Sequence, residues 1–441
     1  MNSDDLVLDV PSLRGEPEHG AYRSVVERLY ALARSGTKYG LDRMRRVLAA
    51  LDHPESLPSI HVAGSNGKGS TCAFLASILA RHGLRVGLFT SPHLVSLTER
   101  IQFLEGDRWS EIGPEALVRA VQELEEVAPG FEGLSFFEVV TAAGLVAMRQ
   151  RGVDVAVVEA GLGARLDATR LVEADLAVLT DLSLEHTAIL GDTLADIARE
   201  EGAVVRPGRP LVMADGPAEA MQVVDGLASA VGASVRRLGT HFRAEFLSKG
   251  FRFWNEELEL SELRLSLRGP HQARNAALAV DAALAFLERP DPEAVAAGLA
   301  AARWPGRLER RQVDGRDVWL DGAQNPHAAW ALARALEADG AQPMHLVFGV
   351  LGDKDAGPML DALVPWARSW TLTRPGSVRA RDPGGVARML LERGVSDVVV
   401  TASPERAWEA VRQRDPGPVL VCGSLYLVGD FRSLWVPRPG G

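Results

Sequence analysis

The sequence predicts an α/β protein of two domains, each built on a mostly parallel β-sheet, with a small antiparallel sheet added to the first. Short apolar runs alternate with amphipathic helical segments along most of the chain, as in parallel sheets that helices cover on both faces. The alternation restarts near Arg303. The chain has 441 residues and is 46% hydrophobic, which is more than one core usually contains, so we expect domains at 1–303 and 304–441.

Hydrophobic periodicity and helix-terminating residues predict the elements of the first domain. In order, we expect helices at 22–36 and 41–54, a strand at 60–63, a helix at 70–81, a strand at 85–90, helices at 114–127 and 136–149, strands at 154–160 and 175–180, and a helix at 192–203. Residues 251–267 alternate apolar and polar, which favours an antiparallel hairpin or small sheet, and helices follow at 272–287 and after Pro292. In the second domain, strands at 318–323, 344–350, 369–373, 397–402 and 418–424 alternate with helical segments.

Composition and charge exclude several classes of function. The formal net charge is -10, whereas nucleic-acid-binding proteins present basic surface, so we expect no nucleic-acid partner. No apolar run approaches the roughly eighteen residues of a membrane span, and the acidic start MNSDDLVLDV is unlike a secretory signal. We therefore expect a cytoplasmic protein without a membrane partner, and we separately expect a monomer. Cys72 and Cys422 are too few for a disulfide framework, and we expect both in the core.

Residues 61–74, HVAGSNGKGSTCAF, combine a glycine-rich turn, a lysine and hydroxyl groups, which is typical of a phosphate-binding loop. The strict pattern is G-x-x-x-x-G-K-[ST], but Val62 stands at its first glycine and Gly69 separates Lys68 from Ser70. Because a strand precedes the turn and a helix follows it, the turn amides and the positive end of the helix would converge on an anion. We therefore expect a nucleotide to bind at Gly64, Ser65, Asn66, Gly67, Lys68, Gly69, Ser70 and Thr71. A plain tight turn is the alternative.

Polar side chains follow three other predicted strands. Glu159 ends the strand at 154–160, His186 follows the strand at 175–180, and Ser91 follows the strand at 85–90. Because parallel strands open at their carboxyl ends into one crevice, these three residues are candidate ligands for Mg²⁺. The alternatives are an acid that faces water, a structural histidine and a helix-capping serine.

A series of longer motifs occurs along the chain in a fixed order. They are GSNGKGS, TSPHL followed by ERI at 99–101, EAGLGARLDAT, SLEHT, HQARNAALA, WPGRLE, LDGAQNPHAA and DKD at 353–355. In this order they resemble the folylpolyglutamate synthase and dihydrofolate synthase family of the Mur-ligase superfamily, over about residues 36–423. The resemblance implies a phosphate-loop ATPase domain followed by a smaller Rossmann-like glutamate-ligase domain. The Lys-Gly-Ser ending resembles this family's version of the loop and differs from the Gly-Lys-Thr or Gly-Lys-Ser ending of the cell-wall Mur enzymes.

The resemblance implies roles for residues that spacing alone does not assign. Asn275, Arg307 and Asp321 would complete the ATP site begun by the glycine loop, and Ser91, Glu159 and His186 would hold magnesium. A pterin-bearing substrate would lie near two segments, namely Ser135, Phe136, Phe137 and Glu138, and Leu166, Asp167 and Ala168. Without the resemblance, an amphipathic helix that buries Phe136 and Phe137 in the core explains the first segment equally well.

Two positions depart from the family's pattern. Glu201 stands where the family usually has a lysine that becomes carbamylated to help bind a second metal ion. A glutamate needs no CO₂ to carry a carboxylate, but its side chain ends about 3–4 Å earlier. Gln324 stands where the family usually has histidine, and an amide does not titrate near neutrality.

The resemblance implies ATP-dependent ligation of L-glutamate to a pterin carboxylate through an acyl phosphate, with dihydropteroate or a reduced folate as the acceptor. The residues expected to take part in catalysis are Lys68, Glu159, His186, Arg307 and Glu201. ATP and Mg²⁺ are the expected cofactors, and a requirement for a monovalent cation such as K⁺ stays open. One rival is a Mur-type amino-acid ligase, although only about sixty residues precede the loop, too few for a typical extra α/β domain. Another is a phosphate-loop nucleotide switch without ligase activity.

Overall fold

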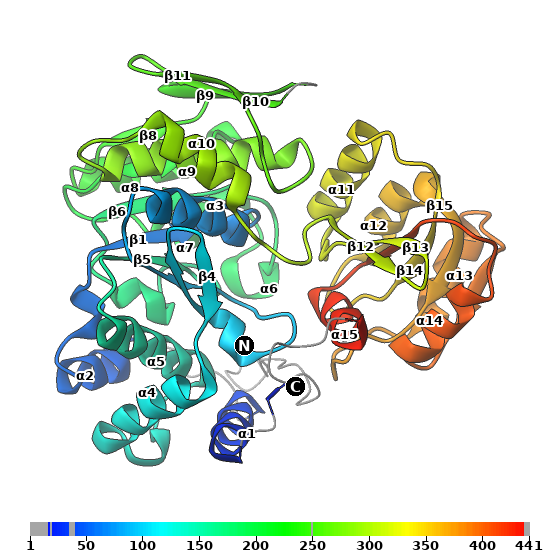
Figure 1. Cartoon of the computed structure of the whole chain (residues 1–441), viewed down its shortest axis with the longest axis horizontal. Helices are drawn as coiled ribbons and strands as arrows, with labels where there is room; N and C mark the ends of the chain where they lie inside the picture. The colour runs from blue at the N-terminus through cyan, green and yellow to red at the C-terminus, as the bar shows by residue number, and fades with distance from the viewer. Residues whose placement is uncertain (1–15, 18–19, 35–39, 248–249, 436–441) are drawn as a thin grey trace.

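The computed structural model describes residues 16–17, 20–34, 40–247 and 250–435 of the chain. The described residues form two α/β units side by side (Figure 1). We call them the first and second domain, and the expected boundary between residues 303 and 304 stays a prediction. The fold class is confirmed, because mostly parallel sheets are present in both domains and a small antiparallel sheet is attached to the first.

The sheet of the first domain has eight strands in the order β4-β3-β2-β5-β1-β6-β7-β8. The strands are β1 (Ser59–Ala63), β2 (Val86–Phe89), β3 (Ile101–Glu105), β4 (Arg108–Glu111), β5 (Val155–Glu159), β6 (Leu176–Leu179), β7 (Leu211–Met213) and β8 (Val235–Arg237). All neighbours pair in parallel except β2–β3 and β3–β4, which are antiparallel. Strand β1 is fully buried between β5 and β6, so the loops that follow these three strands meet at one edge of the sheet.

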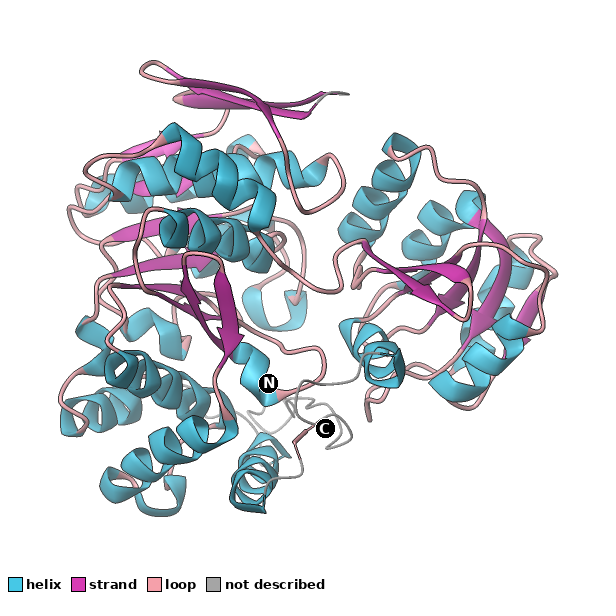
Figure 2. Ribbon diagram, in the orientation of Figure 1, coloured by secondary structure: helices cyan, strands magenta, loops and turns pink. Residues whose placement is uncertain are grey.

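Helices cover both faces of this sheet (Figure 2). They are α1 (Gly20–Arg34), α2 (Asp42–Ala50), α3 (Lys68–Arg81), α4 (Pro114–Val127), α5 (Phe136–Arg151), α6 (Thr187–Leu190), α7 (Leu194–Gly202), α8 (Ala218–Ala230), α9 (His271–Phe286) and α10 (Pro292–Ala301). Short 3₁₀ turns lie at Pro54–Ser56, Leu97–Arg100, Pro129–Phe131 and Ala168–Leu171. One face packs against α3, α9 and α10. The opposite face carries two separate apolar clusters, one under α1, α4 and α5 and the other under α7 and α8.

The alternating segment near residue 251 belongs to a three-stranded antiparallel sheet, not to a lone hairpin. Its strands are β9 (Phe242–Leu247), β10 (Gly250–Asn255) and β11 (Glu259–Leu263), in the order β11-β10-β9. Phe242, Phe251 and Phe253 point into the same core as α9 and α10. The small sheet therefore extends the cover over α9.

The second domain has a six-stranded sheet in the order β12-β13-β17-β14-β15-β16, antiparallel only between β12 and β13. Its strands are β12 (Glu309–Val313), β13 (Arg316–Leu320), β14 (Met344–Phe348), β15 (Ala367–Leu372), β16 (Val398–Val400) and β17 (Val419–Cys422). Its helices are α11 (Pro326–Ala338), α12 (Ala356–Leu363), α13 (Pro383–Glu392), α14 (Pro404–Arg412) and α15 (Leu425–Trp435), with a 3₁₀ turn at Val364–Trp366. Apolar clusters on both faces make this a doubly wound sheet.

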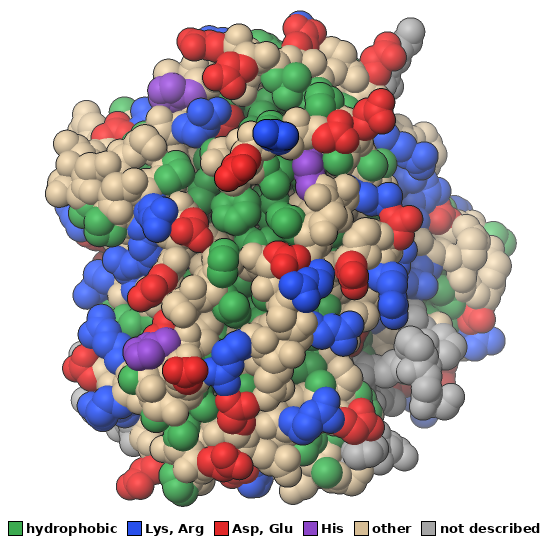
Figure 3. Space-filling view, turned by 60° about the vertical axis from the view of Figure 1, so that its left-hand side comes forward, with side chains coloured by type: hydrophobic (Ala, Val, Ile, Leu, Met, Phe, Trp, Pro, Cys, Tyr) green, Lys and Arg blue, Asp and Glu red, His purple; other side chains and the backbone are tan. Residues whose placement is uncertain are grey.

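Surface charge and cysteine burial are the two features on which composition gave an expectation. Figure 3 shows one face on which basic and acidic side chains are interspersed. Cys72 and Cys422 are both buried as free thiols, as expected. Among the described residues, no helix is long and apolar enough to cross a membrane.

Candidate active site

A glycine loop at Gly64–Gly67 joins the central strand β1 to helix α3, which begins at Lys68. Gly64 and Gly67 have φ values of 126° and 89°, a region that favours glycine. A Cβ at Gly64 would lie 2.2 Å from Thr180 Oγ1 at the end of β6, so the loop also needs glycine for close approach. The amides of the first turn of α3 have no intrahelical acceptor and are available to an anion.

The unusual Lys-Gly-Ser ending of the loop has a packing reason. A Cβ on Gly69 would lie 2.4 Å from Cζ2 of Trp304, whose indole lies against the first turn of α3. Any side chain here would displace a bulky aromatic ring that is packed at the junction of the two domains. The close approach of Trp304, three residues beyond the end of α10, therefore explains why the loop has a glycine at position 69.

Helix α9 supports the loop from the side. Asn275 Oδ1 would lie 2.3 Å from a Cβ on Gly67, and Asn275 Nδ2 donates to Gln272 Oε1 at 2.9 Å. Gln272 Nε2 in turn lies 3.4 Å from Ser70 Oγ. The hydroxyl of Thr71 is buried and has no hydrogen-bond partner among the described residues. A buried polar atom without a partner at this position fits a site that takes a polar ligand.

The loop is also bonded to the segment that follows β6. Ser65 N donates to Asp181 O at 2.8 Å, and the Ser65 and Ser183 residues exchange two further bonds of 3.0 Å. Asn66 Nδ2 donates to Ser183 Oγ at 2.8 Å. The Asp181 carboxylate pairs with Arg274 of α9 at 2.7 Å and so helps to tie α9 to this edge of the sheet.

Lys68 lies at the centre of the acidic groups around the loop. Its Nζ donates to the Gly64 carbonyl at 2.5 Å. Its charge opposes the effect of burial on the pKa of Glu159 and of Glu201, and it also acts on Glu185 and His186. The ammonium group is thus close to the residues that follow β5 and β6 as well as to α7.

Glu201, the residue that departs from the family pattern, lies directly beneath the loop. Its side chain is buried, and its Oε2 accepts the Gly64 amide at 3.0 Å. Burial raises the pKa of Glu201, while Lys68 and the Gly64 amide counteract that rise. The structure therefore gives this carboxylate a contact with the loop backbone.

Glu159 is a buried carboxylate at the end of β5. Burial raises its pKa to about 7, and the charge of Lys68 and the Ser91 amide limit the rise. The Ser91 amide donates to Glu159 Oε2 at 2.9 Å, which brings together two of the three residues expected to bind magnesium. Arg307 of the second domain also acts on the pKa of Glu159, so the two domains meet here.

His186 is the third expected metal ligand and occupies the N-cap position of the short helix α6, where its side chain makes no capping hydrogen bond. Partial desolvation and then the nearby Lys354 lower the pKa of His186, although its side chain is 35% exposed, and this favours the neutral imidazole that can coordinate a metal. The adjacent Glu185 pairs with Lys354 Nζ at 3.3 Å, and both side chains are 9% exposed. Lys354 belongs to the loop between β14 and α12, so this is a buried ion pair between the domains.

The loop between β13 and α11 also reaches the phosphate loop. Asn325 caps α11 through Oδ1, while its Nδ2 donates to Asn66 Oδ1 at 3.2 Å. Asp321 is buried and accepts the amides of Leu308 and Ala323, both at 2.9 Å. Burial raises its pKa, and the charge of Arg307 opposes this. Gln324 lies half-buried on the same loop.

The first segment expected to bind substrate begins α5. The Ser135 hydroxyl accepts the Glu138 amide at 3.3 Å and Glu138 Oε2 accepts the Ser135 amide at 2.8 Å, a capping box that also explains these residues structurally. Phe136 is buried, with the Arg100 guanidinium 5.2 Å from its ring centroid.

The second segment meets the first at Gly161. A Cβ on Gly161 would lie 2.6 Å from Phe137 Cζ and 2.9 Å from Asp167 Oδ2. Leu166 is 41% exposed and Ala168 is buried beside it. The structure thus brings Phe137 and Asp167 together, and their role in substrate binding stays a prediction.

Of the three residues expected to hold Mg²⁺, Ser91 and Glu159 are in contact, whereas no contact of His186 with either is found in the described part of the chain. Among the described residues there is no group of three or more His, Cys, Asp or Glu side chains that could hold a metal ion. The expected set contains only Glu159 and His186 of these types, together with the Ser91 hydroxyl. Mg²⁺ usually takes one or two protein carboxylates and completes its shell with water and phosphate oxygens, so such a sparse set fits it.

Several contact residues of this site were not singled out from the sequence. Gln272, Trp304, Asn325 and Lys354 lie inside motifs that were quoted, but their roles depend on contacts between distant segments. Lys354 carried the clearest signal, because an isolated lysine between two aspartates follows an apolar strand.

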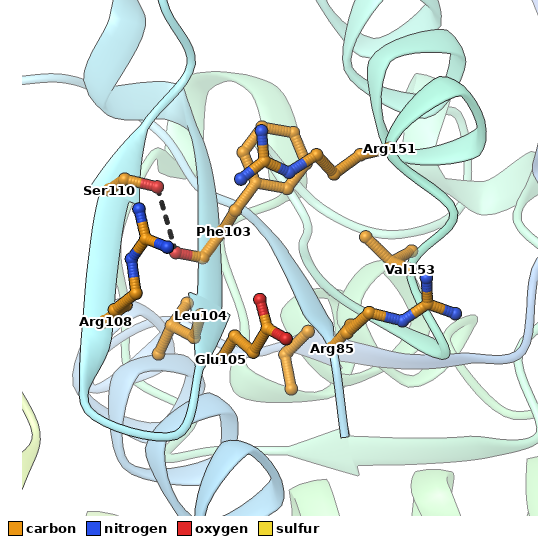
Figure 4. Close-up of a pocket in the computed structure, with 9 residues that line it drawn as sticks. Arg85, Phe103, Leu104, Glu105, Arg108, Ser110, Arg151 and Val153 are labelled. Carbon is orange, nitrogen blue, oxygen red and sulfur yellow. Dashed lines mark hydrogen bonds between the residues drawn. The ribbon is translucent and has the colours of Figure 1, made fainter. Parts of the chain in front are cut away.

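A surface pocket lies at the opposite end of β2, away from the loop (Figure 4). Its lining includes Arg85, Arg108 and Arg151, and the Arg151 guanidinium lies 5.3 Å from the centroid of the Phe103 ring. It shares no residue with the candidate site.

The fold and the site together define a two-domain, phosphate-loop nucleotide-binding protein whose second domain contacts the loop. The Mur ligase, glutamate ligase domain family matches residues 306–425. The chain is 32% identical over 438 residues to a dihydrofolate synthase/folylpolyglutamate synthase of Bacillus subtilis, covering 94% of this chain and 99% of that protein. The chain belongs to the folylpolyglutamate synthase/dihydrofolate synthase family.

Two further comparisons extend this result. A probable bifunctional folylpolyglutamate synthase/dihydropteroate synthase of Haloferax volcanii is 37% identical over 429 residues, which cover 94% of this chain. The chain spans only 50% of the length of that relative. The solved bifunctional folylpolyglutamate synthase/dihydrofolate synthase of Yersinia pestis, complexed with AMPPNP and a Mn ion, has a TM-score of 0.82 and 30% identity, covering 94% of this chain and 97% of that one.

Proposed function

We propose that this protein uses ATP to ligate L-glutamate to the carboxylate of a pterin-bearing acid. Both dihydropteroate and reduced folates are proposed as acceptors. The observation that carries the proposal is the meeting of the phosphate loop, the buried Glu159 and three groups of the second domain, Arg307, Asn325 and Lys354, at one edge of the sheet. A nucleotide switch without ligase chemistry has no need for a second domain bonded to its loop.

Chemistry explains why ATP is required. A carboxylate does not condense with an amine at neutral pH, because its oxygen is a poor leaving group. Attack of the carboxylate on the γ-phosphorus forms an acyl phosphate and releases ADP. The neutral α-amine of glutamate then attacks the acyl carbon, phosphate leaves from the tetrahedral intermediate, and the amine nitrogen loses its extra proton. The protein contributes positioning and electrostatic stabilisation to both steps.

The residues of the loop would hold the triphosphate. Lys68, which the structure places against the loop carbonyls, would turn its ammonium to the β- and γ-phosphates, with the amides of the first turn of α3 around them. Asn275 and Asp321 would complete the nucleotide site. Arg307 would neutralise charge that moves off the γ-phosphate, since it already acts on Glu159 across the domain boundary.

Ser91, Glu159 and His186 would hold a magnesium ion, which supplies charge neutralisation and orientation of the phosphate oxygens. Glu201 would keep the loop in shape through the Gly64 amide without needing CO₂. The substrate ring would lie between Phe137 and the turn at Leu166–Ala168, with Ser135, Phe136 and Glu138 fixing the start of α5. Closure of the second domain would exclude water from the acyl phosphate.

The setting of the protein is part of the proposal. We place it in the cytoplasm, where ATP is abundant and where its two free thiols stay reduced. We propose that it acts as a monomer, which sedimentation at assay concentration tests. Activity in K⁺ compared with tetramethylammonium at equal ionic strength tests a monovalent cation requirement.

Product analysis tests the proposed function. The purified protein is incubated with ATP, Mg²⁺ and glutamate, and with either dihydropteroate or tetrahydrofolate, and products are identified by mass spectrometry. We expect a mass gain of one glutamyl residue on each acceptor, with one ADP formed per glutamate added. ADP formation that is independent of glutamate, or no glutamylated product from either acceptor, would refute the proposal.

A further inference from the structure

A polar chain crosses the apolar interior beneath the first sheet and ends at the proposed substrate turn. It begins at Arg206 after α7, passes through His61 in the middle of β1, continues to Thr169 and ends at Asp167. All four side chains are buried, with exposed fractions of 7%, 0%, 0% and 8%. This polar chain runs along the boundary between the two apolar clusters on this face of the sheet. His61 therefore occupies a buried strand position that usually carries an aliphatic residue.

The donors and acceptors along this polar chain favour one arrangement of protons. Arg206 Nη2 lies 3.3 Å from His61 Nδ1, and a guanidinium cannot accept a hydrogen bond, so Nδ1 carries no proton. At the other end, the Thr169 hydroxyl gives its single proton to Asp167 Oδ1 at 2.5 Å. Thr169 Oγ1 must therefore accept from His61 Nε2, which lies 2.9 Å away. The Thr169 end thus selects the neutral His61 ring with its proton on Nε2, and the Arg206 end agrees, because a proton on Nδ1 would face a donor.

The chemistry around His61 keeps it in that form. Burial and the charge of Arg170 lower the pKa of His61 to about 3. The same Arg206 Nη2 donates to the carbonyls of Arg170 and Val172 at 2.8 and 3.0 Å, which holds it beside the His61 ring, while Nε and Nη1 of Arg206 are buried without a hydrogen-bond partner among the described residues. The ring therefore acts as a rigid, uncharged connector and not as a proton-transfer group.

Asp167 connects the polar chain to two backbone turns through hydrogen bonds. Its Oδ1 also accepts the Thr169 amide at 3.0 Å, and its Oδ2 accepts the Gly161 and Leu162 amides, both at 3.1 Å. The carboxylate thereby ties the glycine turn after β5 to the turn at Ala168–Leu171. Since Phe137 packs on Gly161, the hydrogen bonds of the polar chain also fix the distance between Phe137 and Asp167.

We propose that His61 is a positioning residue for the acceptor substrate, a flat pterin-bearing acid, and acts through Thr169 on the turn that contains Asp167. The inference rests on the proposed function, because it takes the space between Phe137 and Asp167 as the acceptor site. It separates the two substrates: His61 orients the acceptor, whereas Gly64–Thr71 hold ATP.

The test compares KM values for the acceptor and for ATP at pH 8, with ADP binding measured by calorimetry. In His61→Leu and in Thr169→Val the connector is broken, and we expect KM for the acceptor to rise about tenfold, as for one buried hydrogen bond left unpaired. ADP affinity should change less than twofold. In His61→Gln, an amide nitrogen can take the place of Nε2, so this variant should recover most of the acceptor KM.

A matched control is available in the other domain. His345 is also buried on a central strand, β14, where it bonds Ser369 Oγ at 2.7 Å and the Asp415 carbonyl at 3.0 Å. His345→Leu should lower thermal stability without a selective rise in acceptor KM. If wild-type protein is active but both Thr169→Val and His61→Leu keep the acceptor KM within twofold, or raise the ATP and acceptor KM equally, the inference is wrong. A wild-type protein that glutamylates no pterin acid would refute the proposed function and the acceptor role with it.

Discussion

The buried ion pair between Lys354 and Glu185 gives the account a quantitative prediction about domain closure. The two charged groups lie 3.3 Å apart across the domain boundary, and each side chain is 9% exposed. Lys354→Gln removes the cation that lies nearest to Glu185. In the closed arrangement the buried carboxylate then keeps its hydrogen bond with Asn325 and the weaker influence of His186 and Lys68, but loses its ion pair. Loss of one member of a buried pair costs about 3 kcal/mol or more. In an open arrangement water reaches Glu185, so the cost applies to closure and not to folding.

A cost of about 3 kcal/mol corresponds to a roughly hundredfold loss in the fraction of closed enzyme. We therefore expect kcat/KM for ligation to fall by about two orders of magnitude in Lys354→Gln, measured as ADP release coupled to NADH oxidation. The thermal midpoint of the free protein should change little. Adding Glu185→Gln to the same chain should restore part of the activity, because the unpaired charge is removed.

The chain offers a matched control for this variant. Arg268 and Asp339 form a second pair between the domains, 3.0 Å apart, but the Arg268 side chain is 47% exposed. Exposed pairs are worth about 0–1 kcal/mol, so Arg268→Gln should lower kcat/KM by no more than about fivefold. Equal effects of Lys354→Gln and Arg268→Gln, or activity within threefold of wild type in Lys354→Gln, would show that burial of this pair does not control closure.

Two further predictions concern the loop and its carboxylate. Gly69→Ala places a methyl group 2.4 Å from the Trp304 ring, so it should lower the free energy of unfolding by about 1–3 kcal/mol and weaken ATP binding. Trp304→Leu in the same chain should relieve both effects, which thermal unfolding and calorimetry measure. Effects of the two substitutions that simply add in the double mutant would contradict this explanation. Because burial raises the pKa of Glu159 to about 7 from an ordinary value of 4.5, the folded state binds this proton more tightly than the unfolded state does, and stability falls as pH rises through 7. Without nucleotide or metal, the free energy of unfolding of Glu159→Gln at pH 8 should therefore exceed that of wild type by up to about 3 kcal/mol. This difference should disappear below about pH 4.5. A difference of equal size at pH 8 and pH 5 would contradict the assigned burial of Glu159.

Local patterns predicted the scaffold of the site well. The strand, glycine turn and helix at 60–81 are present, and the residues placed at strand ends, Glu159 and His186, do flank the loop. The elements with clear periodicity, such as α4 at Pro114–Val127, have the expected ends. Alternation of helices and strands was enough to predict the sheets, because parallel strands require helical crossovers.

Contacts between distant segments were beyond sequence patterns. The sequence showed Gly69 only as a departure from the phosphate-loop pattern. The ring that occupies the space of a side chain at this position belongs to Trp304, which lies far along the chain. The sequence pattern placed His61 only within an apolar strand. Strand periodicity predicts that a residue is buried, but it does not show which distant side chains, such as Thr169, it bonds. Strand β9, FRAEFL, also alternates apolar and polar residues, but it precedes the segment at 251–267 from which the small sheet was predicted.

Lys68 tests the central claim most directly. In the proposed reaction, the Lys68 ammonium and the amides beside it bind a triphosphate whose γ-phosphate is transferred to the acceptor carboxylate. ADP formation dependent on both acceptor and glutamate should fall below one-thousandth of the wild-type rate in Lys68→Ala, with the fold retained by circular dichroism, since such cationic groups contribute about 10³-fold or more to phosphoryl transfer. A Lys68→Ala protein that still forms ADP and glutamylated product at a rate within tenfold of wild type would contradict the account.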